Sequence, residues 1–547
     1  MAESVDDTSL TPAIPQLVAR IWQRDPSVFA RPGAPAEERQ AILGRFGWLG
    51  APANVAAWAQ DAVAFAQDIA GAGLTDVVLL GMGGSSLCAE VYRDVAVRTS
   101  HGCRLTVLDT TDERAIRAIT ESLHLPQTLF VVASKSGSTL EVTALEAHFW
   151  AQAQSIAGAD AGKHFVAITD PGTPLQSLAK ERGYRHTFIN PPDIGGRYSA
   201  LSLFGIVPAA LVGVDLTTLD DSAVRMATEC REDRDTNPGL ALGTFMATTA
   251  RAGRDKLTVL LAPAMDAFGG WIEQLVAEST GKLGRGVLPI VGEPIGPVKE
   301  YGSDRAFVAV LTDTSGAVAN AARDLERAGH PVFRITASAK DLGAEFFRWE
   351  FATAVAGALL GVNPFDEPNV REAKTRTMAQ LEARAAHGTF RIDPPFTRGE
   401  GYSRREHRLP RGPRSMGRRY IALLDYLPAD SQRSQLFNTF RAALRDRLGL
   451  ATTHGVGPRY LHSTGQFHKG GPNTGIFVLL TATDASATPV PGTDYTFSAL
   501  KQAQALGDFD ALVANGREVV HYHLEDPTAD FSATLEKLIE GLSHMKE

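Results

Sequence analysis

The feature that most constrains the fold is a regular alternation between short apolar runs and stretches long enough to form a helix. The runs are rich in leucine and β-branched residues, and they lie at Val77–Leu80, Leu105–Leu108, Leu129–Ala133 and Phe165–Ile168. Because consecutive parallel strands need a crossover of helical length between them, the alternation predicts a parallel sheet covered by helices on both faces. Polar residues follow each run, and open α/β sheets bind ligands at that carboxyl edge.

A second set of apolar runs begins at Leu257 and includes Phe307–Leu311 and Val332–Ile335, with a helix predicted from Asp266 to Thr280. We therefore predict an α/β protein with two doubly wound αβα sandwich domains, each built on a parallel sheet. They are assigned to residues 49–215 and 216–396, after a helical N-terminal segment at 1–48.

The composition changes at residues 397–419, which contain eight arginines and almost nothing apolar. This pattern predicts an exposed linker, with a phosphate-rich partner as the alternative. Residues 420–547 are predicted to form a C-terminal α/β region. Its expected elements are strands at Tyr420–Leu427 and Ile476–Thr481, a helix at Gln432–Leu448, a terminal helix near Ser532–Leu542 and a surface strand around His521 and His523.

Charge and cysteine content limit the kinds of partner and compartment. The net charge of −8 argues against a nucleic acid or an anionic membrane as the main partner. Three cysteines are too few for a disulfide framework, which favours a reducing compartment. The acidic start, MAESVDDTSL, lacks the pattern of a signal peptide, and no apolar run has the length of a membrane span. We expect a soluble cytoplasmic protein.

Two loops at strand ends have the composition of phosphate-binding loops. In LLGMGGSSL (79–87), the backbone N–H groups of Gly83 and Gly84 and the hydroxyl of Ser85 could hold one phosphate. The dinucleotide fingerprint, with Asp109 on a ribose, is the alternative, but Ser86 stands where its third glycine belongs. A structural tight turn also remains possible.

The second loop, SKSGST, is more specific because a strand runs directly into it and an apolar-faced helix follows. Hydroxyl groups beside free backbone donors at a helix N-terminus form an anion cradle. The loop lacks the GK[ST] ending of a nucleotide P-loop, so a monophosphate is favoured over ATP. Its members are Ser134, Lys135, Ser136, Ser138 and Thr139.

Together these motifs resemble the sugar-isomerase (SIS) family. Four more segments, IGGRYSALS (194–202), EQLVAESTGK (273–282), GHPV (329–332) and GVNPFDEPNVREAK (361–374), resemble its glucose-6-phosphate isomerase branch. The C-terminal third, with YLHSTGQFHKGGPNTG (460–475), is most similar to the isomerase half of transaldolase–isomerase fusions. The resemblance implies two SIS-type domains and isomerisation of glucose 6-phosphate to fructose 6-phosphate through a cis-enediolate, in glycolysis and gluconeogenesis. It also implies a homodimer and a functional link to a transaldolase.

The resemblance also assigns roles to individual residues. Glu278 is implied to be the base, one helical turn after Gln274, and burial near Trp271 should raise its pKa. Arg197 is implied to stabilise the enediolate, because its guanidinium stays charged. The residues implied to hold substrate are Gly84, Ser85, Ser134, Lys135, Ser136, Ser138, Thr139 and Gln274.

The groups that open the sugar ring are harder to assign. Lys374 keeps the family's spacing from Asn363 and is implied to assist ring opening, with Lys501 as a distant alternative. His330 fits the family's order along the chain, whereas His468 lies in GQFH, which is similar to a family motif but comes after the lysine. A structural role for both histidines stays open.

Base, cation and acid all come from side chains, so no cofactor is expected, and no Cys/His cluster has zinc spacing. Three alternatives remain. A non-catalytic sugar-phosphate regulator would not need Glu278, Gln274 and Lys374 together, and an amidotransferase would carry an N-terminal cysteine, where Ala2 stands. A dehydrogenase is disfavoured by Ser86.

Overall fold

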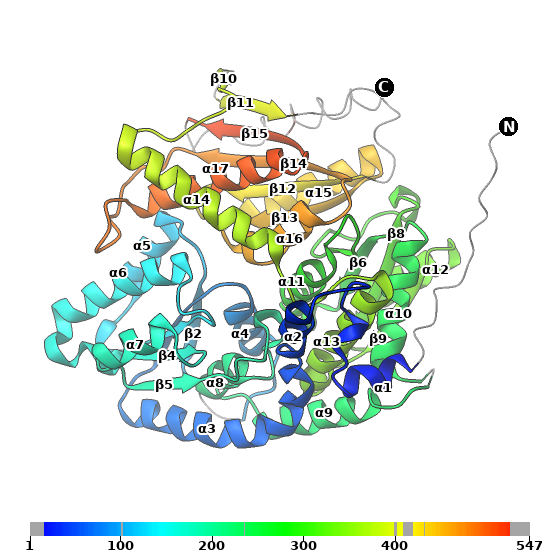
Figure 1. The fold of residues 1–547 in the computed structure, drawn as a ribbon, viewed down its shortest axis with the longest axis horizontal. Helices are drawn as coiled ribbons and strands as arrows, with labels where there is room; N and C mark the ends of the chain where they lie inside the picture. Colours follow the sequence, from blue (N-terminus) through cyan, green and yellow to red (C-terminus); the bar gives the residue numbers. More distant parts are fainter. Residues whose placement is uncertain are drawn as a thin grey trace.

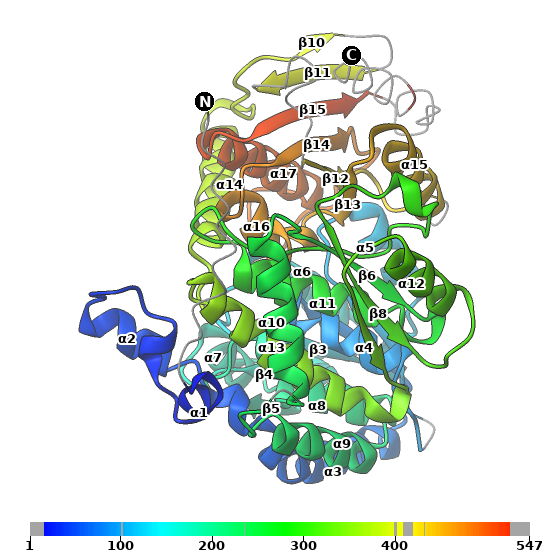
Figure 2. The same ribbon diagram turned by 90° about the vertical axis from the view of Figure 1, so that its right-hand side faces the viewer.

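The computed structural model describes residues 16–99, 102–234, 236–398, 402–407, 419–430 and 433–525, together with Glu536. These residues form two parallel sheets and a third, mixed sheet, each with its own helices. The third sheet lies above the other two in both views (Figures 1 and 2). The predicted helix near Ser532–Leu542 lies outside the described residues, apart from Glu536.

The first sheet has the strand order β2-β1-β3-β4-β5, with every neighbouring pair parallel. Its strands are β1 (Asp76–Gly81), β2 (Arg104–Leu108), β3 (Thr128–Ala133), β4 (Phe165–Thr169) and β5 (His186–Ile189). The helices of this region are α3 (Val55–Gly71), α4 (Leu87–Asp94), α5 (Glu113–Ser122), α6 (Leu140–Ala157) and α7 (Pro174–Glu181). The four predicted strands are confirmed. β5, an edge strand in which only Phe188 is buried, was not predicted from the sequence.

The second sheet has the order β7-β6-β8-β9 and is also parallel. Its strands are β6 (Lys256–Leu261), β7 (Leu288–Ile290), β8 (Arg305–Leu311) and β9 (Val332–Thr336). The associated helices are α9 (Leu216–Glu229), α10 (Pro238–Arg251), α11 (Phe268–Thr280), α12 (Ala317–Arg327) and α13 (Leu342–Leu360), whereas α8 (Leu203–Leu211) packs against α3 and α4. Two short helices, α1 (Leu17–Trp22) and α2 (Ala36–Leu43), precede the first sheet. The chain is thus an α/β protein with parallel-sheet domains.

The third sheet belongs to the C-terminal region and has the order β10-β11-β15-β14-β12-β13. Its strands are β10 (Thr397–Arg398), β11 (Tyr402–His407), β12 (Tyr420–Tyr426), β13 (Ala451–Val456), β14 (Gly475–Ala482) and β15 (Glu518–Leu524). Its helices are α14 (Pro368–His387), α15 (Arg433–Leu448), α16 (Gly465–Gly470) and α17 (Phe497–Ala514).

Within the arginine-rich segment, the prediction of an exposed linker is wrong for residues 402–407. These residues form β11, which pairs antiparallel with β15. Arg405 is buried. Its guanidinium lies 3.7 Å from the ring centroid of Phe509, and its Nε donates to His521 Nδ1 at 3.0 Å. A cation–π contact of this kind stabilises a buried arginine. His521 is therefore buried as well, not part of a surface strand as predicted.

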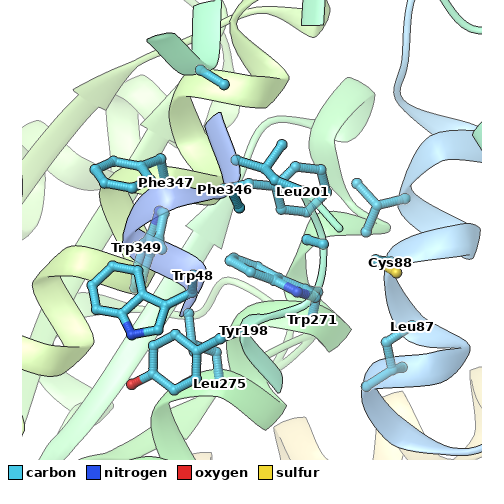
Figure 3. Packing of buried hydrophobic residues seen from close by; sticks show 14 of the residues in the cluster. Trp48, Leu87, Cys88, Tyr198, Leu201, Trp271, Leu275, Phe346, Phe347 and Trp349 are labelled. Carbon is cyan, nitrogen blue, oxygen red and sulfur yellow. The ribbon is translucent and has the colours of Figure 1, made fainter. Parts of the chain in front are cut away.

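The main hydrophobic core surrounds α11 (Figure 3). The ring of Trp271 packs edge-on against Phe346 of α13 at 4.8 Å, and Trp48 packs against Tyr198 at 5.2 Å. Leu275 is fully buried in the same cluster. This packing fixes the rotation of α11, the helix that carries two of the predicted site residues. No helix among the described residues is both long and apolar enough to cross a membrane.

Candidate active site

A cavity of about 740 Å³ lies at the carboxyl edge of the first sheet. Segments far apart in the sequence meet here: the loops after β1 and β3, the turn that carries Arg197, helix α11 and the loop before α14. The residues implied by the family resemblance that line the cavity are Gly84, Ser85, Lys135, Ser136, Thr139, Arg197, Gln274 and Glu278. Ligands of doubly wound sheets bind at this edge.

The glycine-rich loop after β1 approaches its neighbours too closely for any side chain. Gly83 has φ +54°, and a Cβ there would lie 2.7 Å from both Gln274 Nε2 and the His462 carbonyl oxygen. A Cβ on Gly84 would lie 2.0 Å from the carbonyl oxygen of Gly196. Glycine is therefore required at both positions to bring these segments together.

The hydroxyl groups of the second loop divide into two pairs. Ser136 and Thr139 line the cavity just before α6 begins at Leu140. Ser134 is buried beneath them, with its Oγ 3.0 Å from Thr139 Oγ1, and Ser138 Oγ lies 3.3 Å from Ser136 Oγ. Ser134 and Ser138 thus support the two hydroxyls that face the cavity. Together with the start of α6, this arrangement suits an anion.

Two cations lie near this cradle. Lys135 forms an ion pair with Asp170 and donates to the Pro192 carbonyl at 3.0 Å, and burial lowers its pKa. Arg45 lines the same cavity, and its side chain forms no hydrogen bond or ion pair among the described residues. Arg45 was not predicted as a site residue, since it lies in a segment without any recognised motif.

Glu278 is buried at the cavity wall, one turn after Gln274. Burial raises its pKa, and the charge of Arg197 opposes this shift without cancelling it. Gln274 Nε2 donates to Glu278 Oε2 at 3.0 Å and to the His462 carbonyl at 2.8 Å. Glu278 is therefore a fixed carboxylate whose proton affinity is higher than usual, as a general base requires.

Arg197 is held on several sides, so its guanidinium has a fixed position. Its Nε donates to Ser279 Oγ at 2.9 Å, and its Nη2 donates to the carbonyl oxygens of Pro364 and Asp366 at 2.8 Å each. Nη1 lies 3.3 Å from Glu278 Oε1 and 3.1 Å from Glu367 Oε2. A buried cation of fixed orientation can stabilise an anion that forms beside it.

The structure brings a histidine to the cavity that the sequence analysis missed. His462 lies at the end of η11 (Arg459–His462), and its Nε2 is 3.0 Å from Glu141 Oε1. Burial lowers its pKa, but the charge and hydrogen bond of Glu141 outweigh burial and raise the pKa above its usual value. Gln504 Nε2 also donates to Glu141 Oε1, at 2.6 Å. His462 is therefore suited to donate a proton near neutral pH.

Neither of the two histidines named from the sequence lines this cavity. His330 precedes β9, at the amino edge of the second sheet, and its ring packs against Phe307 at 5.3 Å. His468 is buried in α16 against Phe477 at 5.1 Å, and burial lowers its pKa well below its usual value. Order along the chain favoured His330, but the fold separates it from Glu278.

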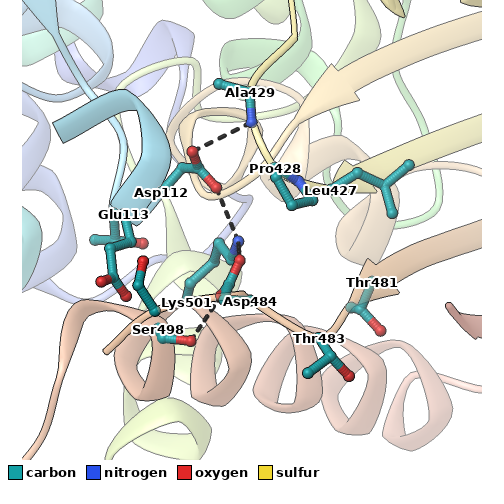
Figure 4. A network of polar contacts seen from close by, with 12 residues as sticks. Asp112, Glu113, Leu427, Pro428, Ala429, Thr481, Thr483, Asp484, Ser498 and Lys501 are labelled. Carbon is teal, nitrogen blue, oxygen red and sulfur yellow. Dashed lines mark hydrogen bonds and ion pairs between the residues drawn. The ribbon is translucent and has the colours of Figure 1, made fainter. Parts of the chain in front are cut away.

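The two lysines considered for ring opening also lie apart. Lys374 lines a smaller cavity of about 240 Å³ that shares Ser136, Thr139, Glu367 and His462 with the main one. Lys501 is buried and bridges two carboxylates, Asp112 at 2.8 Å and Asp484 at 2.5 Å (Figure 4). Asp112 caps α5 in the first domain, so Lys501 joins that domain to the C-terminal region.

The described part of the chain holds no group of three or more His, Cys, Asp or Glu side chains arranged to bind a metal ion.

Comparison with known proteins identifies relatives of this chain. A family profile, Phosphoglucose isomerase, matches residues 62–283. A glucose-6-phosphate isomerase of Rubrobacter xylanophilus is 30% identical over 363 residues, which cover 56% of this chain and 83% of the relative. A probable glucose-6-phosphate isomerase of Methanococcus maripaludis is 28% identical over 346 residues, covering 55% of this chain and 77% of the relative.

Solved structures agree at the level of the fold. A hypothetical protein of Thermus thermophilus is similar with a TM-score of 0.57 and 24% identity, covering 68% of this chain and 97% of that protein. A glucose-6-phosphate isomerase of Chlamydia trachomatis has a TM-score of 0.50 and 20% identity, covering 68% of this chain and 78% of that protein. On the strength of its sequence relatives, this chain is an enzyme that belongs to the phosphoglucose isomerase family.

Proposed function

We propose that the protein catalyses the reversible isomerisation of D-glucose 6-phosphate to D-fructose 6-phosphate through a cis-enediolate. One observation carries the proposal: the buried carboxylate of Glu278 lies 3.3 Å from the Arg197 guanidinium, in a cavity that also contains the hydroxyl cradle. The relatives named as glucose-6-phosphate isomerases support the choice of substrate.

In the proposed mechanism, the cradle residues Ser136 and Thr139 bind the phosphate. His462 donates a proton to the ring oxygen while the C1–O5 bond breaks, and the proton that the anomeric hydroxyl releases passes through solvent back to His462. Lys374 assists ring opening from the adjoining cavity. Ser136, Thr139 and His462 line both the main cavity and the adjoining one that Lys374 lines.

Glu278 then takes the C2 proton, which leaves an enediolate whose negative charge Arg197 stabilises. Return of that proton to C1, with transfer of the hydroxyl proton from O2 to O1, gives the ketose. Glu278 is protonated and deprotonated once in each turnover, so the proton transfers of isomerisation need no cofactor.

A direct test is an assay of the purified chain with fructose 6-phosphate in D₂O, with and without a chelator. We expect formation of glucose 6-phosphate, deuterium at the exchanged carbon and no loss of activity with the chelator. A sugar-phosphate regulator would instead bind the substrate without turnover or exchange, and that outcome would refute the proposal.

The cradle predicts a specific loss of affinity. We expect Ser136→Ala combined with Thr139→Ala to raise KM at least tenfold, because hydrogen bonds to a charged group contribute about 1.5–3 kcal/mol each. The inhibition constant of inorganic phosphate should rise in parallel. Ser155→Ala is the matched control, since Ser155 is exposed near the other end of α6 and its hydroxyl donates to the Gln152 carbonyl. An unchanged phosphate constant in the double variant would place the phosphate elsewhere.

The wider assignments belong to the same proposal. We propose a role in glycolysis and gluconeogenesis, a homodimer, and action beside a transaldolase. The resemblance of YLHSTGQFHKGGPNTG to the isomerase half of transaldolase–isomerase fusions supports the last of these.

A further inference from the structure

We propose that Arg459 is a positioning residue for ring opening, which fastens the segment carrying His462 to the glycine-rich loop of the first domain. The inference rests on the proposed function, because it concerns the proton donor of that reaction.

The segment η11 is a single turn of 3-10 helix with no side-chain cap at its start. Arg459 begins this turn and His462 ends it, three residues later. Residues three apart in a 3-10 helix lie on the same side. Both side chains accordingly contact the first domain: His462 contacts Glu141 of α6, and Arg459 contacts Glu90 of α4 and Asp109 after β2.

Arg459 connects two carboxylates. Its Nη1 donates to Glu90 Oε1 at 3.0 Å, and its Nη2 pairs with the other oxygen of Glu90. Its Nε lies 3.3 Å from Asp109 Oδ2. The planar guanidinium supplies donors in a rigid fork that can bind both carboxylates at once, whereas a lysine ammonium offers only a point charge.

Asp109 extends the connection to the glycine-rich loop. Its Oδ2, the oxygen nearest Arg459, also accepts a hydrogen bond from Ser86 Oγ at 3.1 Å. Ser86 Oγ also lies 3.1 Å from the Gly83 carbonyl oxygen, so its single O–H proton is shared between these two acceptors. Arg459, Asp109 and Ser86 thus fix η11 relative to Gly83 and Gly84, next to which His462 lies.

Neither contact of His462 replaces this connection. Gln274 holds only its carbonyl oxygen, and Glu141 holds its ring through a single hydrogen bond. The position of η11 along the first domain is therefore set at its other end, by Arg459. The dinucleotide-binding alternative placed Asp109 on a ribose, whereas in the structure Asp109 contacts Arg459.

The test compares Arg459→Lys and Asp109→Asn with the control Arg182→Lys. Arg182 forms an ion pair with Glu146 within the first domain and does not contact η11. Opening and reclosing the ring interconverts the two anomers of glucose 6-phosphate, so NMR exchange between anomers reports ring opening separately from isomerisation. Binding of an acyclic hexitol 6-phosphate reports the rest of the site.

In Arg459→Lys and in Asp109→Asn we expect anomer exchange and kcat to fall at least tenfold, while the affinity for the acyclic ligand stays unchanged. The control should show neither loss. The pKa of His462 in Arg459→Lys, measured by NMR titration and assigned with His462→Gln, should fall toward 6.5, the ordinary value of histidine. Asp109→Asn is tested by anomer exchange alone, because loss of the Asp109 charge by itself lowers the pKa of His462. Wild-type anomer exchange in both Arg459→Lys and Asp109→Asn, with an unshifted His462 pKa in Arg459→Lys, would overturn the inference.

The His462 titration also separates a shift in position from a change of charge. The charged groups around His462 are Glu141, Glu278 and Asp109, with Lys374 in the adjoining cavity. In Arg459→Met, loss of a positive charge alone would raise the pKa of His462, whereas loss of the Glu141 contact lowers it. A raised pKa in Arg459→Met would contradict the positioning role.

Failure of the proposed function gives a different result. Wild-type protein would then bind sugar phosphates without isomerising them or exchanging their anomers. The titration of His462 needs no activity, so it decides the positioning role in that case as well.

Discussion

Glu278→Gln is expected to lower kcat by about a thousandfold, within the range that one general base contributes. Glutamine keeps the shape of the side chain and its contact with Gln274 but has no oxygen basic enough to take the C2 proton. Substrate affinity should change little, since the cradle and Arg197 remain. Exchange of the C2 hydrogen with D₂O should fall by the same factor as kcat, because both begin with this proton transfer.

Glu273→Gln is the matched control for this variant. Glu273 lies on the same helix, and burial raises its pKa to about 7, but it does not line the main cavity. We expect Glu273→Gln to retain wild-type turnover. Wild-type C2 exchange in Glu278→Gln would show that another group is the base.

The second large effect is expected for His462→Gln, at about a hundredfold loss of kcat with ring-closed substrate. The remaining rate should approach the rate at which the sugar opens spontaneously. Anomer exchange by the enzyme should disappear, since glutamine cannot donate a proton to the ring oxygen at neutral pH. Binding of an acyclic hexitol 6-phosphate should persist.

The pH profile separates the roles of the two groups. Activity should rise with pH as Glu278 ionises, at a pKa above the usual range of glutamate because the side chain is buried. Activity should fall again as His462 loses its proton, at a pKa that Glu141 holds above the usual value. In His462→Gln the falling limb should vanish and the rising limb remain.

His330→Gln and His468→Gln are controls with the opposite expectation. Neither histidine lines the cavity, so anomer exchange should stay at the wild-type level in both variants. Replacing His468, which is buried among aromatic rings, should show instead as a lower melting temperature. Loss of anomer exchange in His330→Gln would restore that residue to the ring-opening role.

Strand prediction worked where the strands are long and buried. The runs at Val77–Leu80 and Leu129–Ala133 are apolar throughout because central parallel strands are covered on both faces. β7 has only three residues, and β5 is partly exposed, so neither produces a clear apolar run. β11 is rich in arginine, and its burial depends on aromatic rings of distant segments.

The sequence by itself determined the parts of the site that local spacing encodes. The loop from Ser134 to Thr139, the glycines before Ser85 and the one-turn spacing of Gln274 and Glu278 need only neighbouring residues to be recognised. Tertiary structure decided which histidine joins them. His330, His462 and His468 are equivalent as isolated residues, but only His462 is brought beside Glu141, by packing of η11 against the first domain. That contact joins residues 321 positions apart, and no local pattern encodes a contact over such a distance.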